Sequence, residues 1–261
     1  MHAVLTLTLM HDRYLRDQRD NVPQFEEAFH NYRTTALFNK VLSSPIDPAD
    51  REPIWATCIL LGIISFNHVD AEVPEQAWPL RPPSPMDLNW LAISNGKRPL
   101  WQKLQGLAQD SPFQVTAPKQ QWSLNLSQST SRLTALPREL LELCDLRSAT
   151  VVDDRNPYLA AALALGKAWP ETEMLACVLN FLFFISNVEP AFQASLRQKD
   201  PCALLLLLFW YAKVPQQLWW VSRRAILEGQ AIRIYLERYY AYNKMIMNLL
   251  TLPQTFVGDA S

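Results

Sequence analysis

Four histidines and four cysteines are the residues of this chain best suited to metal binding or nucleophilic catalysis. No two histidines share the spacing of metal ligands on one helix face. The cysteines form no C-x-x-C pair, and three of them lie in apolar helical stretches. We therefore expect no metal site and predict buried free thiols in a reducing compartment. The residues are His2, His11, His30 and His68, and Cys58, Cys144, Cys177 and Cys202.

The sequence motifs of the common enzyme classes are absent. There is no H-E-x-x-H, no G-x-S-x-G and no dinucleotide-binding glycine pattern. Gly96-Lys97 has no Ser or Thr after it and no earlier glycine at phosphate-loop spacing, which predicts a surface turn. His68 follows an apolar helix in "SFNHVD". We interpret it as a helix-terminal histidine favoured by the helix dipole, with a role in an interior site as the alternative.

Basic residues near the C-terminus alternate with acidic ones. Arg224 precedes Glu228, and Arg233 precedes Glu237, by the four residues that place two side chains on one helix face. The net charge is −1, whereas a nucleic-acid-binding face needs a surplus of positive charge. We predict a solvated helix face and no direct contact with nucleic acid.

Aromatic side chains are concentrated on three apolar stretches, near residues 53–66, 174–185 and 200–214. Such residues are most often core, but an apolar cavity with a few polar groups is also the usual form of a lipophilic-ligand site. We expect Asn180, Asn187 and Lys213 to be able to supply further polar groups there. The predicted ligand-binding residues are Trp55, Cys58, Phe66, His68, Phe181, Phe184, Trp210, Tyr211 and Trp219.

Composition predicts an all-α fold. Only six of 261 residues are glycine, and sheets joined by tight turns need more. Hydrophobic residues make up 49% of the chain, enough for a substantial core. The uncharged run from Cys202 to Ala212 is too short to cross a membrane, which needs about 20 apolar residues. We therefore expect no membrane span, and since no secretion signal is recognisable, nothing suggests secretion.

The pattern of caps and apolar residues predicts one helical-bundle domain over residues 1–261. Asp50, Asn156 and Asp200 are expected N-caps, the last two followed by proline. The helix at about 200–214 is apolar on every side, so we expect it at the centre of the bundle. Residues 109–136 are polar and rich in Ser, Thr and Gln, which predicts a mobile surface segment.

A set of sequence blocks occurs in a recognisable order: "MHAVLTLTLMHDRYL", "YRTTALFNKVLSSP", "IWATCILLGIISF", "EQAWPL", "DLNWLAISNGKRPLW", "LPRELLELCDL", "NPYLAAALAL", "KDPCALLLLLFWYAKV" and "WWVSRRAILEGQAIRIYLERY". Together they resemble the C-terminal regulatory domain of fungal zinc-binuclear-cluster transcription factors, in particular the sterol uptake control regulators. The resemblance covers nearly the whole chain. It implies an all-helical, often dimeric domain, which in the sterol regulators holds ergosterol in a hydrophobic pocket and releases the protein to the nucleus when the ligand is lost.

The leading hypothesis is therefore a ligand-sensing regulatory domain for a sterol-like or other lipophilic molecule. The resemblance implies a cytoplasmic and nuclear location and a homodimer, and we expect no cofactor. The family's zinc cluster needs C-x2-C-x6-C beside a basic region, and this chain has neither. A second departure is the pair Asn67 and His68, where relatives tend to have small residues.

The missing zinc cluster leaves two interpretations open: a regulatory domain excised from a longer factor, or a free-standing relative. A free-standing relative could serve fungal secondary metabolism as a metabolite-binding protein or a cofactor-free, Diels–Alderase-like cyclase. Such an enzyme would act through proximity and a hydrogen-bond donor, for which His68, Tyr211 and Lys213 are the candidates. A third hypothesis is a purely structural dimerisation domain with a filled core and no pocket.

Overall fold

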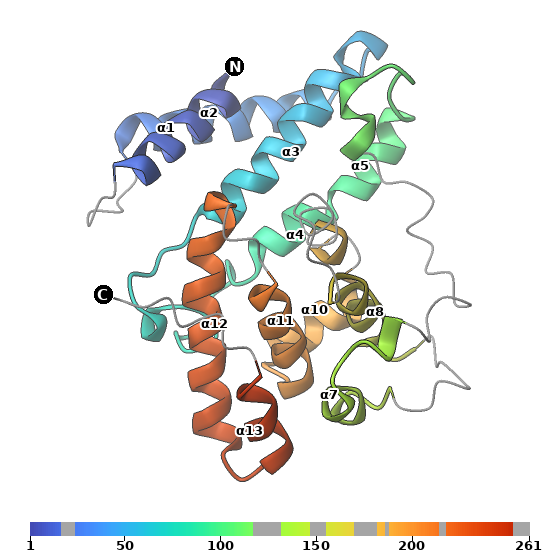
Figure 1. The fold of residues 1–261 in the computed structure, drawn as a ribbon. Coiled ribbons are helices and arrows are strands. Elements are labelled where there is room, and N and C mark those ends of the chain that lie inside the picture. The colour runs from blue at the N-terminus through green and yellow to red at the C-terminus, as the bar shows by residue number, and fades with distance from the viewer. Residues whose placement is uncertain are drawn as a thin grey trace. The chain divides into compact units, whose positions relative to one another are not determined.

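The computed structural model consists of α-helices joined by turns and short 3₁₀ helices (Figure 1). Its described residues form eleven α-helices, three 3₁₀ helices and no strand, which confirms the predicted all-α fold. Contacts divide the chain into two compact units, and each is treated by itself below: Met1–His68 with Ala92–Lys119, and Val69–Leu91 with Gln120–Ser261. The single domain expected over residues 1–261 stays a prediction. The described residues are 1–16, 24–116, 132–146, 155–169, 182–185, 188–213 and 218–252.

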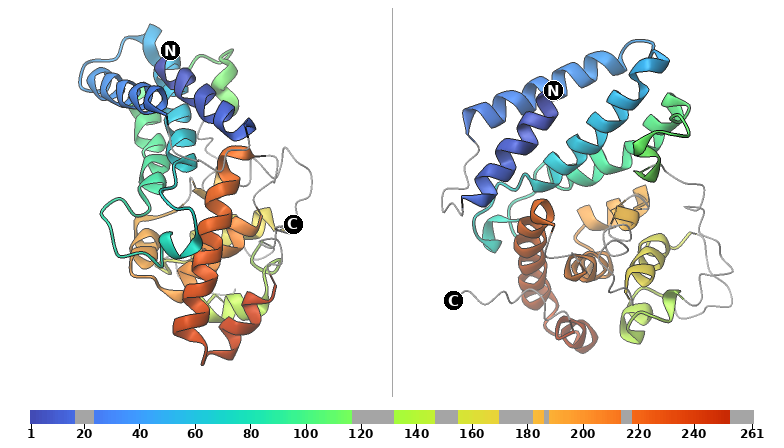
Figure 2. Two further views of the ribbon diagram at one scale, coloured as in Figure 1. Left: turned by 90° about the vertical axis from the view of Figure 1, so that its left-hand side faces the viewer. Right: turned by 45° about the horizontal axis from the view of Figure 1, so that its top comes forward.

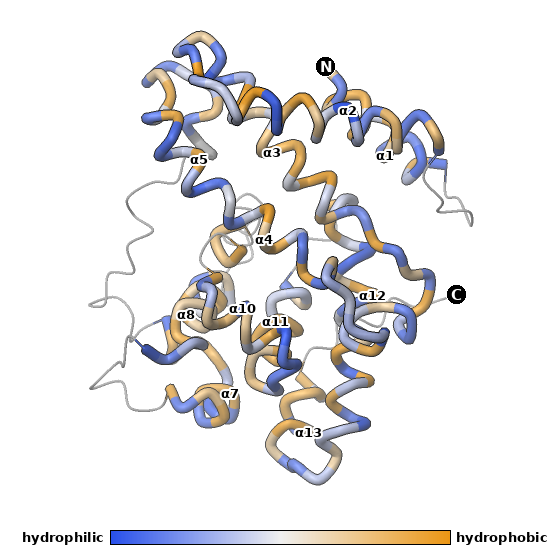
Figure 3. The backbone as a smooth tube through the Cα atoms, turned by 180° about the vertical axis from the view of Figure 1, so that it is seen from behind, coloured by the Kyte–Doolittle hydropathy of each residue, from blue (hydrophilic) through white to orange (hydrophobic). Residues whose placement is uncertain are grey.

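In the N-terminal unit, α1 packs against both α2 and α3 (Figure 2). Its helices are α1 (His2–Leu15), α2 (Phe25–Leu42), η1 (Pro48–Asp50), α3 (Arg51–Asn67), α5 (Lys97–Leu104) and η3 (Pro112–Thr116). Hydrophobic residues predominate along α3 after its first turn (Figure 3). Trp55 and Cys58 of α3 are buried against Leu100 and Leu104 of α5, and Trp101 meets Trp55 edge to face at 4.9 Å.

Polar contacts fix α1 and α5 on α2. Arg13 of α1 donates two hydrogen bonds to the buried carboxylate of Glu27 on α2, at 3.0 and 2.9 Å. At the other end of α2, Lys103 of α5 donates to the carbonyl of Leu42. That carbonyl belongs to the last turn of the helix and has no partner within it, so a cation there is favourable.

The C-terminal unit is built around α11 (Pro201–Ala212), as predicted. Every residue from Cys202 to Tyr211 is buried, and α11 contacts α7, α8, α10 and α12. Asp200 caps the helix by accepting a hydrogen bond from the backbone amide of Ala203 at 3.0 Å. The surrounding helices are α7 (Arg138–Leu143), α8 (Leu159–Ala168), α10 (Pro190–Arg197), α12 (Trp219–Tyr240) and α13 (Lys244–Leu250).

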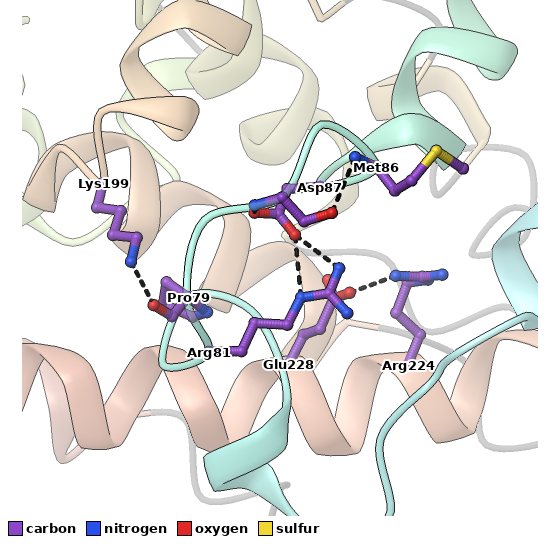
Figure 4. A network of polar contacts seen from close by, with 8 residues as sticks. Pro79, Arg81, Met86, Asp87, Lys199, Arg224 and Glu228 are labelled. Atoms are coloured by element: carbon purple, nitrogen blue, oxygen red, sulfur yellow. Dashed lines mark hydrogen bonds and ion pairs between the residues drawn. The ribbon is translucent and has the colours of Figure 1, made fainter.

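The proline-rich segment at 69–88 is an ordered, mostly non-helical loop, and η2 (Pro74–Gln76) is its one helical turn. Side chains bind its backbone: Arg223 donates to the carbonyl of Ala71 at 2.6 Å, and Lys199 to that of Pro79 at 2.7 Å. Arg81 and Asp87 form an ion pair within it (Figure 4). The chain then enters α4 (Asn89–Asn95), in which the boundary between the two units falls.

Some local predictions need correction. Asn156 does not cap α8, because the N-cap position belongs to Tyr158; the Asn156 side chain instead accepts from the Tyr158 amide and donates to the carbonyl of Cys144. Asp50 stands at the N-cap position of α3 without a side-chain cap bond, and Asp47 caps the preceding η1 turn.

Two predicted segments fall largely outside the described residues. Of the polar segment at 109–136, residues 117–131 are not described; of its described ends, 112–116 form η3, and Leu133 and Leu136 are buried. Of the apolar stretch at 174–185, only 182–185 is described, and it is helical.

Candidate functional site

Two of the predicted aromatic residues, Phe184 and Trp210, form a stack with Trp90 and Phe192 in the C-terminal unit. The ring of Trp210 lies between those of Phe184, at 4.8 Å, and Trp90, at 5.9 Å, both nearly parallel to it. Phe192 closes the stack edge-on against Phe184. All four residues are buried, so aromatic rings fill this part of the core themselves.

A buried polar network lies beside this stack. The Tyr211 hydroxyl donates a 2.5 Å hydrogen bond to Glu228, which also pairs with Arg224 one helical turn earlier. The Arg224 guanidinium lies 5.5 Å from the centre of the Trp90 ring. Burial, and then the Glu228 carboxylate, raise the pKa of Tyr211 well above its ordinary value. Tyr211 therefore keeps its proton, which already forms the hydrogen bond to Glu228. The predicted solvated face is wrong for Arg224–Glu228, whereas the exposed Arg233–Glu237 pair fits it.

The remaining predicted residues of this unit have other surroundings. Lys213 donates to the carbonyl of Trp169 at 2.8 Å, and its ammonium lies over the Trp169 ring. Trp219 is half-buried at the first position of α12. Phe181, Asn180 and Asn187 lie outside the described residues.

The predicted residues of the N-terminal unit all belong to α3 or to its C-cap. Trp55, Cys58 and Phe66 are buried, while His68 is exposed at the C-cap, the position expected for a helix-terminal histidine. Burial raises the pKa of the Cys58 thiol to about 11, although the Lys97 ammonium opposes the shift. Cys58 is therefore a protonated core thiol. Cys58, Cys144 and Cys202 are all free and buried, and Cys177 is not among the described residues.

A groove in the N-terminal unit is the best candidate for a ligand site among the described residues. It lies between α1, α2 and α3 and has a volume of about 290 Å³, close to the lower limit for small-molecule sites. Its walls are mostly apolar, and none of the nine predicted ligand-binding residues is among them. The lining residues are Met1, His2, Ala3, Thr34, Leu37, Phe38, Val41, Asp50, Pro53, Ile54 and Thr57.

The polar groups of this groove are mostly hydrogen-bond acceptors. The hydroxyl of Thr34 donates to the carbonyl of His30, and that of Thr57 to the carbonyl of Pro53. Since each hydroxyl proton is already used, either oxygen can only accept a further hydrogen bond. Asp50 adds a carboxylate. The groove is thus complementary to an apolar molecule that carries a hydrogen-bond donor.

His2 is the imidazole group of the groove. Its Nδ1 lies 2.8 Å from Nδ1 of His30, so one of the two nitrogens must carry a proton and the other a lone pair. Partial desolvation, followed by the charges of His30 and Arg33, lowers the pKa of His2. The contact between the two rings joins α1 to α2.

The sequence contained no direct signal for this groove. Leu37, Val41 and Ile54 are ordinary apolar positions, and only the packing of three helices brings them together with Thr34 and Thr57. Within the described part of the chain, no cluster of three or more metal-ligating side chains occurs, and no helix is long and apolar enough to cross a membrane. No family model matches the chain, and no curated protein or solved structure does so.

Proposed function

We propose that the chain is a ligand-sensing regulatory domain and that it binds a small lipophilic molecule with one hydroxyl group in the groove between α1, α2 and α3. The observation that carries the proposal is the groove itself, an apolar surface with acceptors. The resemblance to fungal sterol regulators supports a sterol-like ligand and the regulatory role.

The apolar wall provides the affinity. Leu37 and Val41 are 42% and 40% exposed, which is unusual for neighbouring aliphatic residues beside a concave surface. Covering them removes apolar area from water at about 25 cal/mol per Å². Because the groove touches three helices, a ligand that fills it stabilises their packing against one another, and this is the physical basis for sensing.

The acceptors provide the orientation. The hydroxyl of a sterol-like ligand would donate to Thr34, Thr57 or Asp50, while the rest of the molecule covers Leu37 and Val41. A ligand with a methylated hydroxyl keeps its apolar area but leaves these acceptors without a donor, which costs about 1–3 kcal/mol.

Thermal unfolding of the purified chain with ergosterol and with ergosterol methyl ether tests the proposal. At a free concentration of about 100 times Kd, a ligand adds about 2.7 kcal/mol of stability, which raises the Tm of a unit of this size by about 10 °C. We expect this shift with ergosterol and a smaller one with the ether. Absence of any shift with ergosterol, cholesterol or palmitate would refute the proposal.

A matched pair of variants localises the effect. Leu37→Arg places a charge on the groove wall and should abolish the ergosterol shift. Ile226→Arg changes a residue of the other unit that is equally exposed, at 45%, and should leave the shift intact. If both variants respond like the wild type, the ligand binds elsewhere and the groove is the wrong site.

The alternative hypothesis, a cofactor-free cyclase using His68, Tyr211 and Lys213, has no described contact in its favour. Tyr211 and Lys213 already donate to Glu228 and to the carbonyl of Trp169, and His68 belongs to the other unit. It stays a prediction, as do the cytoplasmic and nuclear location and the link to transcription.

A further inference from the structure

Lys97 brings an amine into the contact between α3 and α5. It is the first residue of α5, and its side chain is half-buried. A Cβ added to Gly62 of α3 would lie 3.2 Å from both Cε and Nζ of Lys97, so the end of the lysine side chain rests on this glycine. Cys58 precedes Gly62 by four residues and therefore lies on the same side of α3. The amine is thus held against an apolar helix beside a thiol.

Gly62 makes room for this amine. It lies in the interior of α3, where alanine would favour the helix more than glycine does. Its φ is not in the left-handed region, so the backbone does not require a glycine at this position. What the missing side chain provides is space, and the Lys97 side chain occupies it. The contact therefore gives a physical reason for a glycine inside this apolar helix.

The surroundings of the amine favour its uncharged form. Lys97 forms no ion pair with another described residue, and the first turn of α5 contains no acidic residue. The positive end of the helix dipole and the exposed Arg98 both disfavour a cation there. Desolvation by burial lowers the pKa of Lys97. A Cys58 thiolate would oppose this shift, but the pKa of that thiol is about 11, so it is protonated at neutral pH.

We propose that Lys97 is a nucleophilic amine that forms a Schiff base with small apolar aldehydes. An uncharged lysine amine in an apolar environment is the form that attacks a carbonyl carbon. The nitrogen bonds to the carbonyl carbon, and the two amine hydrogens leave with the carbonyl oxygen as water. A C=N bond replaces the C=O bond, and the step needs no oxidant or reductant.

The neighbours of Lys97 on α5 indicate the class of aldehyde. Leu100 and Trp101 follow Lys97 by three and four residues, so they lie on its side of the helix. Both belong to the hydrophobic cluster around Trp55. An apolar aldehyde gains contacts with these side chains, and it reaches the half-buried amine from solvent. Lys97 does not line the groove between α1, α2 and α3, so the amine site is independent of the proposed ligand.

Reductive trapping of the full chain with butanal and cyanoborohydride at pH 7 tests the proposal, because hydride from the reagent converts a Schiff base into a stable secondary amine. Peptide mass spectrometry then gives the labelling rate of each lysine. We expect Lys97 to be labelled about tenfold faster than the exposed Lys40 and Lys244, since the rate follows the uncharged fraction of the amine. The preference should disappear in guanidinium chloride. Equal labelling in the folded chain, or the same preference in the unfolded chain, overturns the proposal.

A pH profile and two variants distinguish a nucleophilic amine from a merely accessible one. Between pH 7 and 10, the labelling rate of Lys97 should level off at a lower pH than that of Lys40. Gly62→Ala displaces the amine toward water and should reduce Lys97 labelling to the level of Lys40, with folding checked by circular dichroism. Cys58→Ala removes the thiol but no amine and should leave the adduct in place. Coincident pH profiles, unchanged labelling in Gly62→Ala, or loss of the adduct in Cys58→Ala excludes this site.

Discussion

Among substitutions on α12 that exchange one polar side chain for another of the same size, Glu228→Gln should destabilise the chain most. The side chains of Arg224 and Glu228 are only 8% and 6% exposed, so the pair has lost most of its hydration. Removing one charge leaves the guanidinium desolvated without its carboxylate, which typically costs 3–5 kcal/mol. Glutamine still accepts from Tyr211, so the loss reports the charge rather than the packing.

The same helix carries the control. Arg233 and Glu237 have the same spacing and a 2.9 Å contact, but their side chains are 40% and 41% exposed. Glu237→Gln should therefore cost only about 0.3–0.5 kcal/mol. Helix, spacing and substitution are identical, and the two pairs differ in burial and in the Tyr211 hydrogen bond, which glutamine retains.

Urea unfolding followed by circular dichroism and tryptophan fluorescence measures both costs. A triple variant, Arg224→Met, Glu228→Leu and Tyr211→Phe, removes all three polar partners and should recover at least half of the Glu228→Gln loss, since no buried polar group is then left unsatisfied. Equal costs for Glu228→Gln and Glu237→Gln, or a triple variant less stable than Glu228→Gln, would refute the reasoning.

Two further predictions concern backbone contact and pH. Gly166→Ala in α8 should destabilise the chain by about 1–3 kcal/mol in urea unfolding, although alanine normally favours helices, because the new Cβ would lie 2.1 Å from the carbonyl oxygen of Arg132. For His2, the lowered pKa means that the unfolded chain binds the proton more tightly. Stability is fully present above the ordinary pKa of 6.5 and falls as the pH drops below it, so the urea midpoint should decrease between pH 7.5 and 5.5, and less so in His2→Gln.

The sequence predicted the elements of this fold well wherever one local signal determined them. α11 is the clearest example: Asp200 and Pro201 mark its start, and a run without charges predicts burial on all sides. Asn156 shows the limit of the same reasoning. It has the residue type and the following proline of a cap, but its amide bonds to the Cys144 carbonyl of a distant turn, so the helix begins at Leu159.

The candidate site could not be predicted because its residues become neighbours only in the folded chain. Aromatic residues drew attention to α3, to α11 and to the helical segment at 182–185, where Trp210 and Phe184 stack on each other in the core. The groove is instead lined by small and aliphatic residues such as Ala3 and Val41, with Thr57 on the facing helix. Their types are common everywhere on helices, and no spacing within one helix distinguishes them.

Helix α2 shows that an apolar side identified from periodicity need not be buried. Phe25, Phe29 and Tyr32 recur with the period of one helix side, yet they are 79%, 45% and 70% exposed, so a shared apolar side does not by itself imply burial. In α11 the cover is the unit's own core. In α2 the inner side combines Glu27, which is held by Arg13 of α1, with Phe38 and Leu42, which pack against the cluster around Trp55. A bidentate pair with well-satisfied geometry can hold a helix in place while its aromatic side remains in solvent. Periodicity therefore identifies the residues that share one side of a helix, whereas the partners available to each side decide which side is buried.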